Sequence, residues 1–181
     1  HQEARRQRQM CIRDRLIGCS AEQARAAVIN LAGLHGPRWC DSSLMDIPWL
    51  RWVTPADAGY FEAMLADSTE RFIQYYADRL ADTDVDILRA FAPKCGSWLM
   101  DRRERFALVH GDYRLDNLLF AGPDDGVSVA TVDWQTLEAG NPGRDLAYFL
   151  GNSLLPAERR AHEQELVCAY HEALLSHEVR D

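Results

Sequence analysis

The chain has 181 residues, of which 47% are hydrophobic and 27% are charged, as in a globular domain rather than a disordered or fibrous chain. Its net charge of −8 disfavours nucleic acid as a partner, because such a surface repels phosphate backbones, but it does not exclude a nucleotide whose charge a metal ion neutralises. The sequence has neither an apolar run of roughly 18 residues nor a secretory leader, and we therefore expect a cytoplasmic protein with no membrane partner.

The first residues differ in composition from the rest of the chain. Residues 1–15 contain five arginines and no helical apolar stripe, and residues 8–15 resemble translated sequencing-adapter read-through. A basic arm or a solvated helix is the alternative interpretation. We expect residues 1–15 to be an artefactual or disordered leader without function, and residues 16–181 to form one lobe.

Three helices are predicted in the first half of the chain. Ser20 begins a capping-box pattern, and apolar residues at helical spacing follow until the Gly-Pro pair at 36–37. Thr54 followed by proline is typical of a second helix start. The apolar stripe of that second helix comprises Ala58, Phe61, Leu65, Phe72 and Tyr76. A third helix is expected over about 84–100.

The sequence changes character near Phe106. Short apolar runs at 106–109, 118–120 and 127–132, with a dense turn signal at 122–126, predict a β-hairpin that has polar residues at its ends. A glycine-containing turn and two helices follow, the last one amphipathic. The order of helices, a small β element and further helices predicts an α+β, mainly helical fold.

Three oxygen-bearing side chains follow the predicted strands. Asp112 and Asn117 lie five positions apart between two apolar runs, and Asp133 comes at the end of the next run. Because the strands of one hairpin lie close together, we expect these side chains to face one pocket. Such hard ligands suit Mg²⁺. Phosphoryl transfer needs a carboxylate that accepts a hydroxyl proton and metal ions that neutralise phosphate charge, and the Asp-x4-Asn spacing is that of the protein kinase catalytic loop.

Several segments resemble the aminoglycoside phosphotransferase and choline kinase superfamily, whose fold is related to that of protein kinases. Residues 110–112 with Asn117 resemble its H-G-D-x-x-x-x-N motif, and residues 132–134 resemble its I/V-D-W motif. Residues 140–150 are similar to its G-x-P-x-x-D-L-A segment. The stretch 34–50 resembles the L-H-x-x-x-W region of bacterial members, and the chain is similar to the ecdysteroid-kinase-like branch as well. The resemblance implies the C-terminal lobe of a protein-kinase-like fold, with a small β-hairpin carrying the catalytic loop.

The same resemblance implies a role for each matching residue. Asp112 would be the catalytic base, and His110 would brace the loop by hydrogen bonding. Arg114, two residues after the base, would contact phosphate. Asn117 and Asp133 would hold Mg²⁺ and, through it, the nucleotide.

Further positions have competing interpretations. Asp145 would fix the catalytic loop from behind, but a carboxylate at a helix start is also favoured by the helix dipole alone. Gln135 and Trp39 are candidate members of a substrate pocket, although core packing is the more frequent role of tryptophan, and we expect it for Trp39, Trp49 and Trp52. His35, at the end of a helix stripe, is interpreted as a packed histidine rather than a ligand.

An ATP-binding lobe is expected to be absent from this chain. Residues 1–105 contain no G-x-G-x-x-G, and Lys94, the only lysine, falls in a predicted helix rather than on a strand. We therefore expect the catalytic and acceptor-binding lobe of an ATP- and Mg²⁺-dependent small-molecule kinase, with negligible activity by itself. The alternatives are a non-catalytic, pseudokinase-like binding module and a metal-dependent phosphohydrolase. These motifs predict neither the acceptor nor the oligomeric state.

Overall fold

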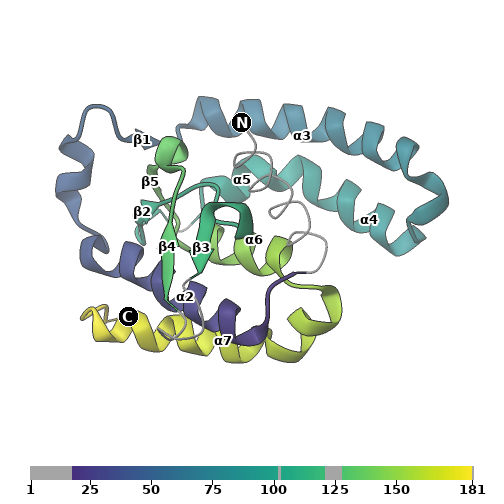
Figure 1. Cartoon of the computed structure of the whole chain (residues 1–181). Coiled ribbons are helices and arrows are strands. Elements are labelled where there is room, and N and C mark those ends of the chain that lie inside the picture. Colours follow the sequence, from purple (N-terminus) through teal and green to yellow (C-terminus); the bar gives the residue numbers. More distant parts are fainter. Residues whose placement is uncertain (1–17, 102, 121–127, 181) are drawn as a thin grey trace, which may run out of the picture. The chain divides into compact units, whose positions relative to one another are not determined.

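The computed structural model describes residues 18–101, 103–120 and 128–180 (Figure 1). The leader predicted for residues 1–15 and the turn predicted at 122–126 lie outside the described residues. The chain divides into two compact units. Unit 1 comprises the residues up to Arg51 and from Glu104 onward, and unit 2 comprises Trp52–Arg103. No helix within the described ranges is long and apolar enough to cross a membrane.

Unit 1 is built from two stretches of the chain, one before and one after unit 2, and both contribute helices. The described strands belong to unit 1, except that one strand residue, Trp52, falls in unit 2. The elements of unit 1 are α2 (Ala21–His35), β1 (Arg51–Trp52, which ends in unit 2), β2 (Ala107–Val109), β3 (Leu118–Phe120), β4 (Val129–Thr131), β5 (Glu138–Gly140), α6 (Gly143–Ser153) and α7 (Pro156–Ser176). Contacts of Cys40 connect the first stretch to the start of the second, at residues 104–106. The backbone N–H of Cys40 donates to the carbonyl oxygen of Phe106 at 2.8 Å, and its Sγ lies 3.3 Å from the carbonyl oxygen of Glu104.

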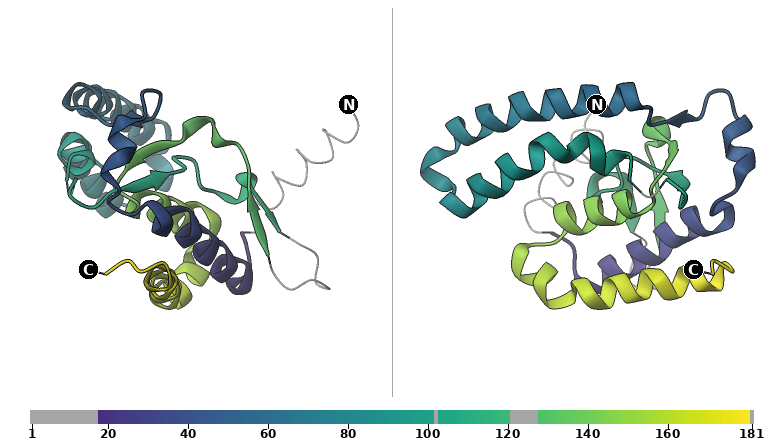
Figure 2. Two further views of the ribbon diagram at one scale, coloured as in Figure 1. Left: turned by 90° about the vertical axis from the view of Figure 1, so that its left-hand side faces the viewer. Right: turned by 180° about the vertical axis from the view of Figure 1, so that it is seen from behind.

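Two long helices form the core of unit 1. α2 and α7 lie side by side in each view (Figures 1 and 2). Their buried side chains are Ala24, Ala27, Val28, Leu31, Ala32 and His35 of α2 and Leu166, Ala169, Tyr170 and Leu174 of α7. α2 begins with the predicted capping box, because Ser20 Oγ accepts the Gln23 N–H at 3.2 Å and Gln23 Oε1 accepts the Ser20 N–H at 3.0 Å.

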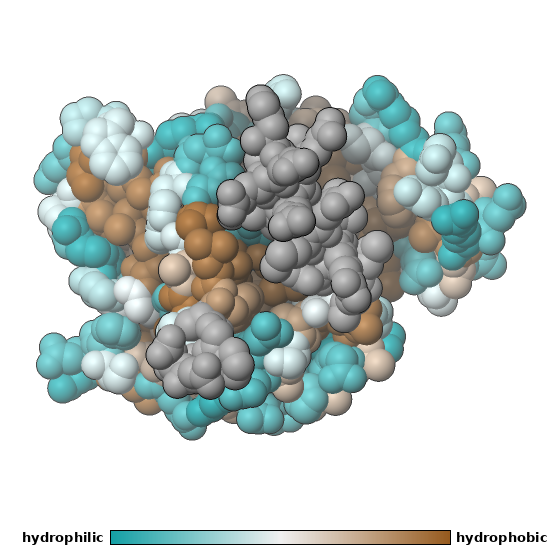
Figure 3. All heavy atoms as spheres, in the orientation of Figure 1, coloured by the Kyte–Doolittle hydropathy of each residue, from teal (hydrophilic) through white to brown (hydrophobic). Residues whose placement is uncertain are grey.

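Two short antiparallel strand pairs position the predicted catalytic loop. β2 pairs with β5, where Leu108 lies opposite Ala139, and β3 pairs with β4, where Leu119 lies opposite Ala130. The sequence predicts a single hairpin with the loop at its end. The structure instead places the loop 110–117 between two strand pairs, because β2 pairs with β5 rather than with β3. Apolar side chains gather on the surface over the β3–β4 hairpin, where Leu119 is exposed (Figure 3).

Unit 2 consists mainly of helices α3 (Pro55–Tyr75), α4 (Asp82–Phe91) and α5 (Cys95–Leu99). α3 starts at the predicted position, with Thr54 as its N-cap, whose Oγ1 accepts the Asp57 N–H at 3.2 Å. The third predicted helix is divided into α4 and α5 by a short 3-10 segment that contains Pro93. Proline lacks the N–H that an uninterrupted helix would need there.

Two of the predicted packing positions are wrong. Phe72, in the predicted stripe of α3, is 44% exposed, and the buried positions on that helix are Ala58, Thr69 and Ile73. Trp49 is 68% exposed rather than packed in the core. Helical spacing identifies an apolar face, whereas burial depends on which neighbours cover each turn, and the sequence does not give those neighbours.

Candidate functional site

A backbone hydrogen bond links the predicted catalytic loop to the residue that precedes the predicted metal ligand Asp133. The Val132 N–H donates to the carbonyl oxygen of Asn117 at 2.9 Å, one position beyond the β3–β4 ladder. Asn117 is buried, whereas Asp133 is exposed, and within the described residues we find no hydrogen bond or ion pair of its side chain. Asp133 adopts φ 66° and ψ 61°, a left-handed conformation in which aspartate and asparagine are enriched. The chain therefore turns sharply at the residue that follows Val132.

The carboxylate of Asp112 is contacted at both oxygens. Asn117 Nδ2 donates to Asp112 Oδ2 at 3.0 Å and to the Asp112 carbonyl oxygen at 2.8 Å. Arg114 Nε lies 3.1 Å from Asp112 Oδ1, and Arg114 Nη1 lies 3.6 Å from Asp116 Oδ2. The predicted base, the predicted ligand Asn117 and Arg114 thus form one polar cluster in the loop.

His110 connects the loop to the end of β4. Its imidazole is fully buried, with Nε2 at 3.0 Å from the Val132 carbonyl oxygen and Nδ1 at 3.3 Å from the backbone nitrogen of Asp112. A carbonyl accepts and an N–H donates, so a neutral ring with its proton on Nε2 satisfies both contacts. The ring of Trp134 lies edge-on to it, with centroids 4.9 Å apart. His110 therefore holds the loop beside the strand that leads to Asp133.

Asp145 lies behind the loop, in the first turn of α6. The residue is 1% exposed, and its carboxylate accepts the His110 N–H on Oδ2 at 2.6 Å and the Gly111 N–H on Oδ1 at 2.9 Å. Gly111 has a φ of +82°, so the backbone reverses between these donors and the Asp112 side chain. Thr136 Oγ1 donates to the His110 carbonyl oxygen at 2.7 Å. Charge-assisted bonds from two successive N–H groups fix the direction of the turn, and they come from the loop rather than from the helix of Asp145.

Asn30 of α2 is a contact residue that no sequence motif marks. Its Oδ1 accepts the Thr131 hydroxyl at 2.8 Å, and its Nδ2 donates to the Val129 carbonyl oxygen at 3.0 Å. The Tyr113 hydroxyl lies 3.0 Å from Asn30 Oδ1 and 2.7 Å from the Ala27 carbonyl oxygen. Burial raises the pKa of Tyr113 above its ordinary value, so the hydroxyl keeps the proton that it donates. Asn30 thereby links the loop to strand β4.

A small cavity lies beside the loop. It has a volume of about 170 Å³ and is lined by Arg114, Leu115 and Asp116 of the loop and by Tyr148 and Asn152 of α6. Neither predicted pocket residue lines it. Gln135 is exposed in the 3-10 turn Trp134–Thr136, and Trp39 is half-buried against the core of unit 1.

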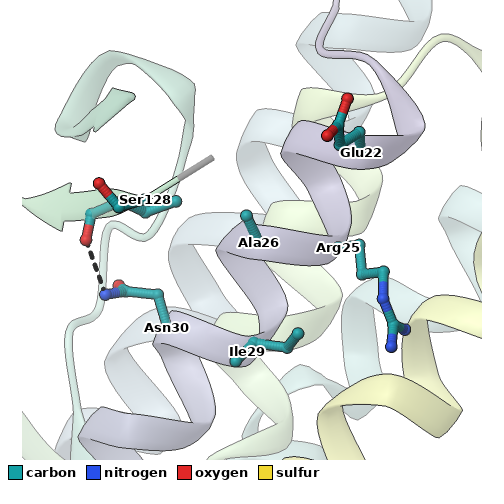
Figure 4. Close-up of a pocket in the computed structure, with 7 residues that line it drawn as sticks. Glu22, Arg25, Ala26, Ile29, Asn30 and Ser128 are labelled. Carbon is teal, nitrogen blue, oxygen red and sulfur yellow. Dashed lines mark hydrogen bonds between the residues drawn. The ribbon is translucent and has the colours of Figure 1, made fainter. Parts of the chain in front are cut away.

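A larger cavity, of about 510 Å³, lies between α2 and the start of β4 (Figure 4). It is lined by Glu22, Arg25, Ala26, Ile29, Asn30, Ser128 and Val129. Figure 4 shows the Asn30 amide directed at the strand. None of the predicted site residues is among the lining residues.

Comparisons with known proteins identify relatives of the chain. Acyl-CoA dehydrogenase family member 10 of Mus musculus is 44% identical over 63 residues, which are 33% of this chain and 6% of that protein. Acyl-CoA dehydrogenase family member 11 is 35% identical over 71 residues in Gallus gallus and 33% identical over 96 residues in Homo sapiens. These alignments cover 39% and 51% of this chain, and 9% and 11% of the relatives. The chain thus matches only about a tenth, or less, of the length of each relative. No solved structure matches the chain.

A family model covers most of the chain. The model of the ecdysteroid kinase-like family matches residues 57–180, a range that includes Asp112, Asn117, Asp133 and Asp145. The observed fold, mainly helical with small sheets, is compatible with the C-terminal lobe of a kinase-like fold. The match supports a kinase-like enzyme and does not specify the acceptor. The chain belongs to the ecdysteroid kinase-like family.

Proposed function

We propose that this chain supplies the catalytic and acceptor-binding lobe of an ATP- and Mg²⁺-dependent phosphotransferase that acts on a hydroxyl group of a small molecule. The observation that carries the proposal is the junction of Asp112, Asn117 and Asp133. Asn117 bonds to the Asp112 carboxylate through its side chain, and its backbone bonds to the residue before Asp133. A candidate base and two candidate metal ligands are thereby linked through Asn117, although Asp133 follows a different strand from the loop.

The donor atoms at this junction fit Mg²⁺. Mg²⁺ is usually held by one or two carboxylates together with phosphate oxygens and water, rather than by a cage of protein ligands. Within the described residues, no group of three or more His, Cys, Asp or Glu side chains converges on a point. Asn117 Nδ2 is bonded to Asp112, so Oδ1 is the atom that it offers to a cation. The Asp133 carboxylate and this amide oxygen would hold the ion, which would neutralise charge on the transferred phosphate.

Asp112 would orient the acceptor hydroxyl and take its proton. Proton transfer requires the carboxylate to lie within hydrogen-bond reach of the hydroxyl. The hydrogen bond from Asn117 Nδ2 to Oδ2 and the contact of Arg114 with Oδ1 hold the carboxylate in one orientation before substrate arrives, which is the preorganisation that phosphoryl transfer relies on. The Arg114 guanidinium lies beside the proposed base, and we propose that it contacts the phosphate that approaches the acceptor oxygen.

The small cavity next to the loop is the candidate acceptor pocket. Arg114 belongs both to its lining and to the Asp112 cluster, so a molecule bound there lies next to the proposed base. The lining combines an aromatic ring, an amide and charged groups, which suits a hydroxylated molecule. Trp39 and Gln135 do not line this cavity, and their part in a substrate pocket stays a separate prediction.

The phosphohydrolase alternative is less favoured, because it needs additional metal ligands at fixed positions. The described residues do not provide such a cluster. The pseudokinase alternative usually involves loss of the base or of the metal ligands, whereas Asp112, Asn117 and Asp133 are all present.

The test is Asp112→Asn in the gene product that contains this chain. That protein is incubated with MgATP and a library of hydroxylated metabolites, and phosphorylated products are detected by mass spectrometry. We expect turnover to fall by about 10²–10⁴-fold, the usual contribution of a general base. Asp46→Asn, at an exposed carboxylate, is the matched control and should retain full activity. Undiminished turnover by the Asp112 variant would exclude the assigned base. We expect negligible turnover by the 181-residue chain alone, because it lacks a Gly-rich loop and a strand lysine.

A further inference from the structure

A chain of buried polar groups extends from the loop into the helical core. Asp145 Oδ2, which accepts the His110 N–H, lies 3.4 Å from His35 Nε2. His35 Nδ1 lies 2.7 Å from the Tyr170 hydroxyl oxygen. The three side chains come from three helices: Asp145 from α6, His35 from the last position of α2, and Tyr170 from α7. Their exposed fractions are 1%, 0% and 7%.

We infer that His35 and Tyr170 are positioning residues that hold the Asp145 carboxylate in the orientation in which it receives the loop N–H groups. The inference rests on the proposed function and extends it, because it assigns the support of the proposed catalytic loop to two further residues. His35 belongs to the L-H-x-x-x-W stretch, which gives it no such role, and Tyr170 belongs to none of the motifs described above. The inference also gives His35 more than the packing role expected for it.

Electrostatics explains why the carboxylate needs this support. A buried carboxylate loses its hydration, and each bond or nearby positive group that remains is therefore worth more than in water. Asp145 receives two backbone N–H groups, one on each oxygen, and both come from the same side, where the loop lies. His35 faces Oδ2 from α2. At 3.4 Å this contact is long for a hydrogen bond, so its main contribution is electrostatic.

Tyr170 in turn fixes the imidazole of His35. The two rings meet edge to face, with centroids 5.8 Å apart and an interplanar angle of 82°. Burial, and after it the charge of Asp145, raises the pKa of Tyr170, so the hydroxyl keeps its proton. A protonated Tyr170 hydroxyl that donates to Nδ1 leaves the ring proton on Nε2, directed at Asp145. Tyr170 of α7 then donates to His35 of α2, and the His35 Nε2–H points to the Asp145 carboxylate.

The experiment measures amide hydrogen exchange of His110 and Gly111 by NMR in the 181-residue chain. The variants are Tyr170→Phe, which keeps the ring but removes the hydroxyl, and His35→Leu. We expect both to accelerate exchange of these two amides at least five-fold relative to the amides of the β3–β4 ladder. His35→Gln retains an N–H donor and should restore most of the protection.

Leu31→Ala is the matched control for general damage to the core. Leu31 lies one turn before His35 on α2 and is equally buried, but it offers Asp145 no hydrogen bond. Its truncation should accelerate all slowly exchanging amides by a common factor, because it lowers the global stability. If the Tyr170 and His35 variants behave in this uniform way, or leave the two amides unchanged, the inference is wrong. Should His35→Leu fail to fold, Tyr170→Phe alone decides.

Failure of this inference is distinguishable from failure of the proposed function. Exchange of the His110 and Gly111 amides requires neither ATP nor an acceptor. An Asp112→Asn gene product with undiminished turnover would refute the proposed base and leave the exchange result intact. Uniform exchange in the Tyr170 variant would refute the support chain and leave the base untouched.

Discussion

Gly111 and Thr136 approach so closely that a Cβ atom on Gly111 would lie 2.7 Å from the Thr136 carbonyl oxygen. The same Thr136 donates its hydroxyl proton to the His110 carbonyl oxygen, so the two segments are locked together at this point. Glycine in the His-Gly-Asp sequence therefore meets two separate requirements. It accepts the positive φ, and it leaves room for the backbone of the neighbouring 3-10 turn.

Gly111→Ala is predicted to destabilise unit 1 by about 1–3 kcal/mol, since the added methyl group meets backbone at a strained φ. Gly33→Ala is the control, because Gly33 is an exposed helical glycine of α2 with no atom within 4 Å of an added Cβ. That substitution should stabilise the chain by about 0.5–1 kcal/mol. Urea denaturation followed by circular dichroism gives both values. Equal free energies of unfolding for the two variants would contradict the predicted clash.

Asn30→Ala is predicted to lower the free energy of unfolding by about 2–3 kcal/mol relative to Asn152→Ala. Both asparagines are helical, so the gain in helix propensity from alanine is the same and cancels in the comparison. Asn30 bonds to Thr131 and Val129 in another element, whereas Asn152 is exposed and donates to the carbonyl oxygen of Tyr148, one turn earlier in its own helix. Chemical denaturation of both variants measures the difference. A difference below about 0.5 kcal/mol would mean that the hydrogen bonds of Asn30 to the loop and to β4 do not stabilise the fold.

Asp133→Asn is predicted to weaken metal binding while leaving the free energy of unfolding almost unchanged. Asparagine tolerates the left-handed conformation of this residue, and the side chain is exposed, so the free energy of unfolding should change by less than about 0.5 kcal/mol. The loss of a carboxylate should weaken Mn²⁺ binding, used as a probe for Mg²⁺, at least ten-fold. Electron paramagnetic resonance of free Mn²⁺ reports the affinity, and Asp46→Asn should leave it unchanged. Retained affinity in the Asp133 variant would remove this residue from the ligand set.

Cys19 is predicted to resist alkylation in the folded chain. Burial raises the pKa of its thiol to about 11, so at pH 8 almost none is thiolate, the reactive form. Exposed Cys40 and Cys168 should react with iodoacetamide under the same conditions, as mass spectrometry of peptides would show. Because the folded state binds this proton more tightly than the unfolded state, the contribution of Cys19 to stability is complete below about pH 9 and falls as the pH rises towards 11. Labelling of Cys19 at the rate of Cys40 would contradict its burial.

Several helix starts and three of the strands could be predicted from local chemistry, whereas β1 and β5 could not be. The caps at Ser20 and Thr54 are short-range patterns, and the structure confirms both. The three short strands near the loop also lie where the apolar runs predict them. What could not be predicted is pairing: the sequence of β2 does not show that its partner is β5. Similarly, the division of the third helix depends on Pro93, a residue whose effect on a helix varies with its surroundings.

In the candidate site, too, local motifs could be read from the sequence, whereas contacts made by tertiary packing could not. Asp112, Asn117 and Asp133 can be proposed from their spacing, because loop motifs place functional atoms at fixed intervals. Asn30 and Tyr170 are separated from the loop by many residues. Helix packing brings Asn30 into contact with Tyr113 of the loop and links Tyr170 to the loop through His35 and Asp145. A single sequence contains no signal for such partners, since an asparagine or a tyrosine on a helix face looks the same whether or not a loop lies against it.

Unit 1 is joined across its interruption by Cys40, which bonds to Glu104 and Phe106 without any contribution from residues 52–103. A segment that leaves a closed domain and returns to it can change in length at a small entropic cost, about 0.6 kcal/mol for each doubling. Insertions and deletions within this segment should therefore cost unit 1 little stability, while Asp112 and its supports stay in place.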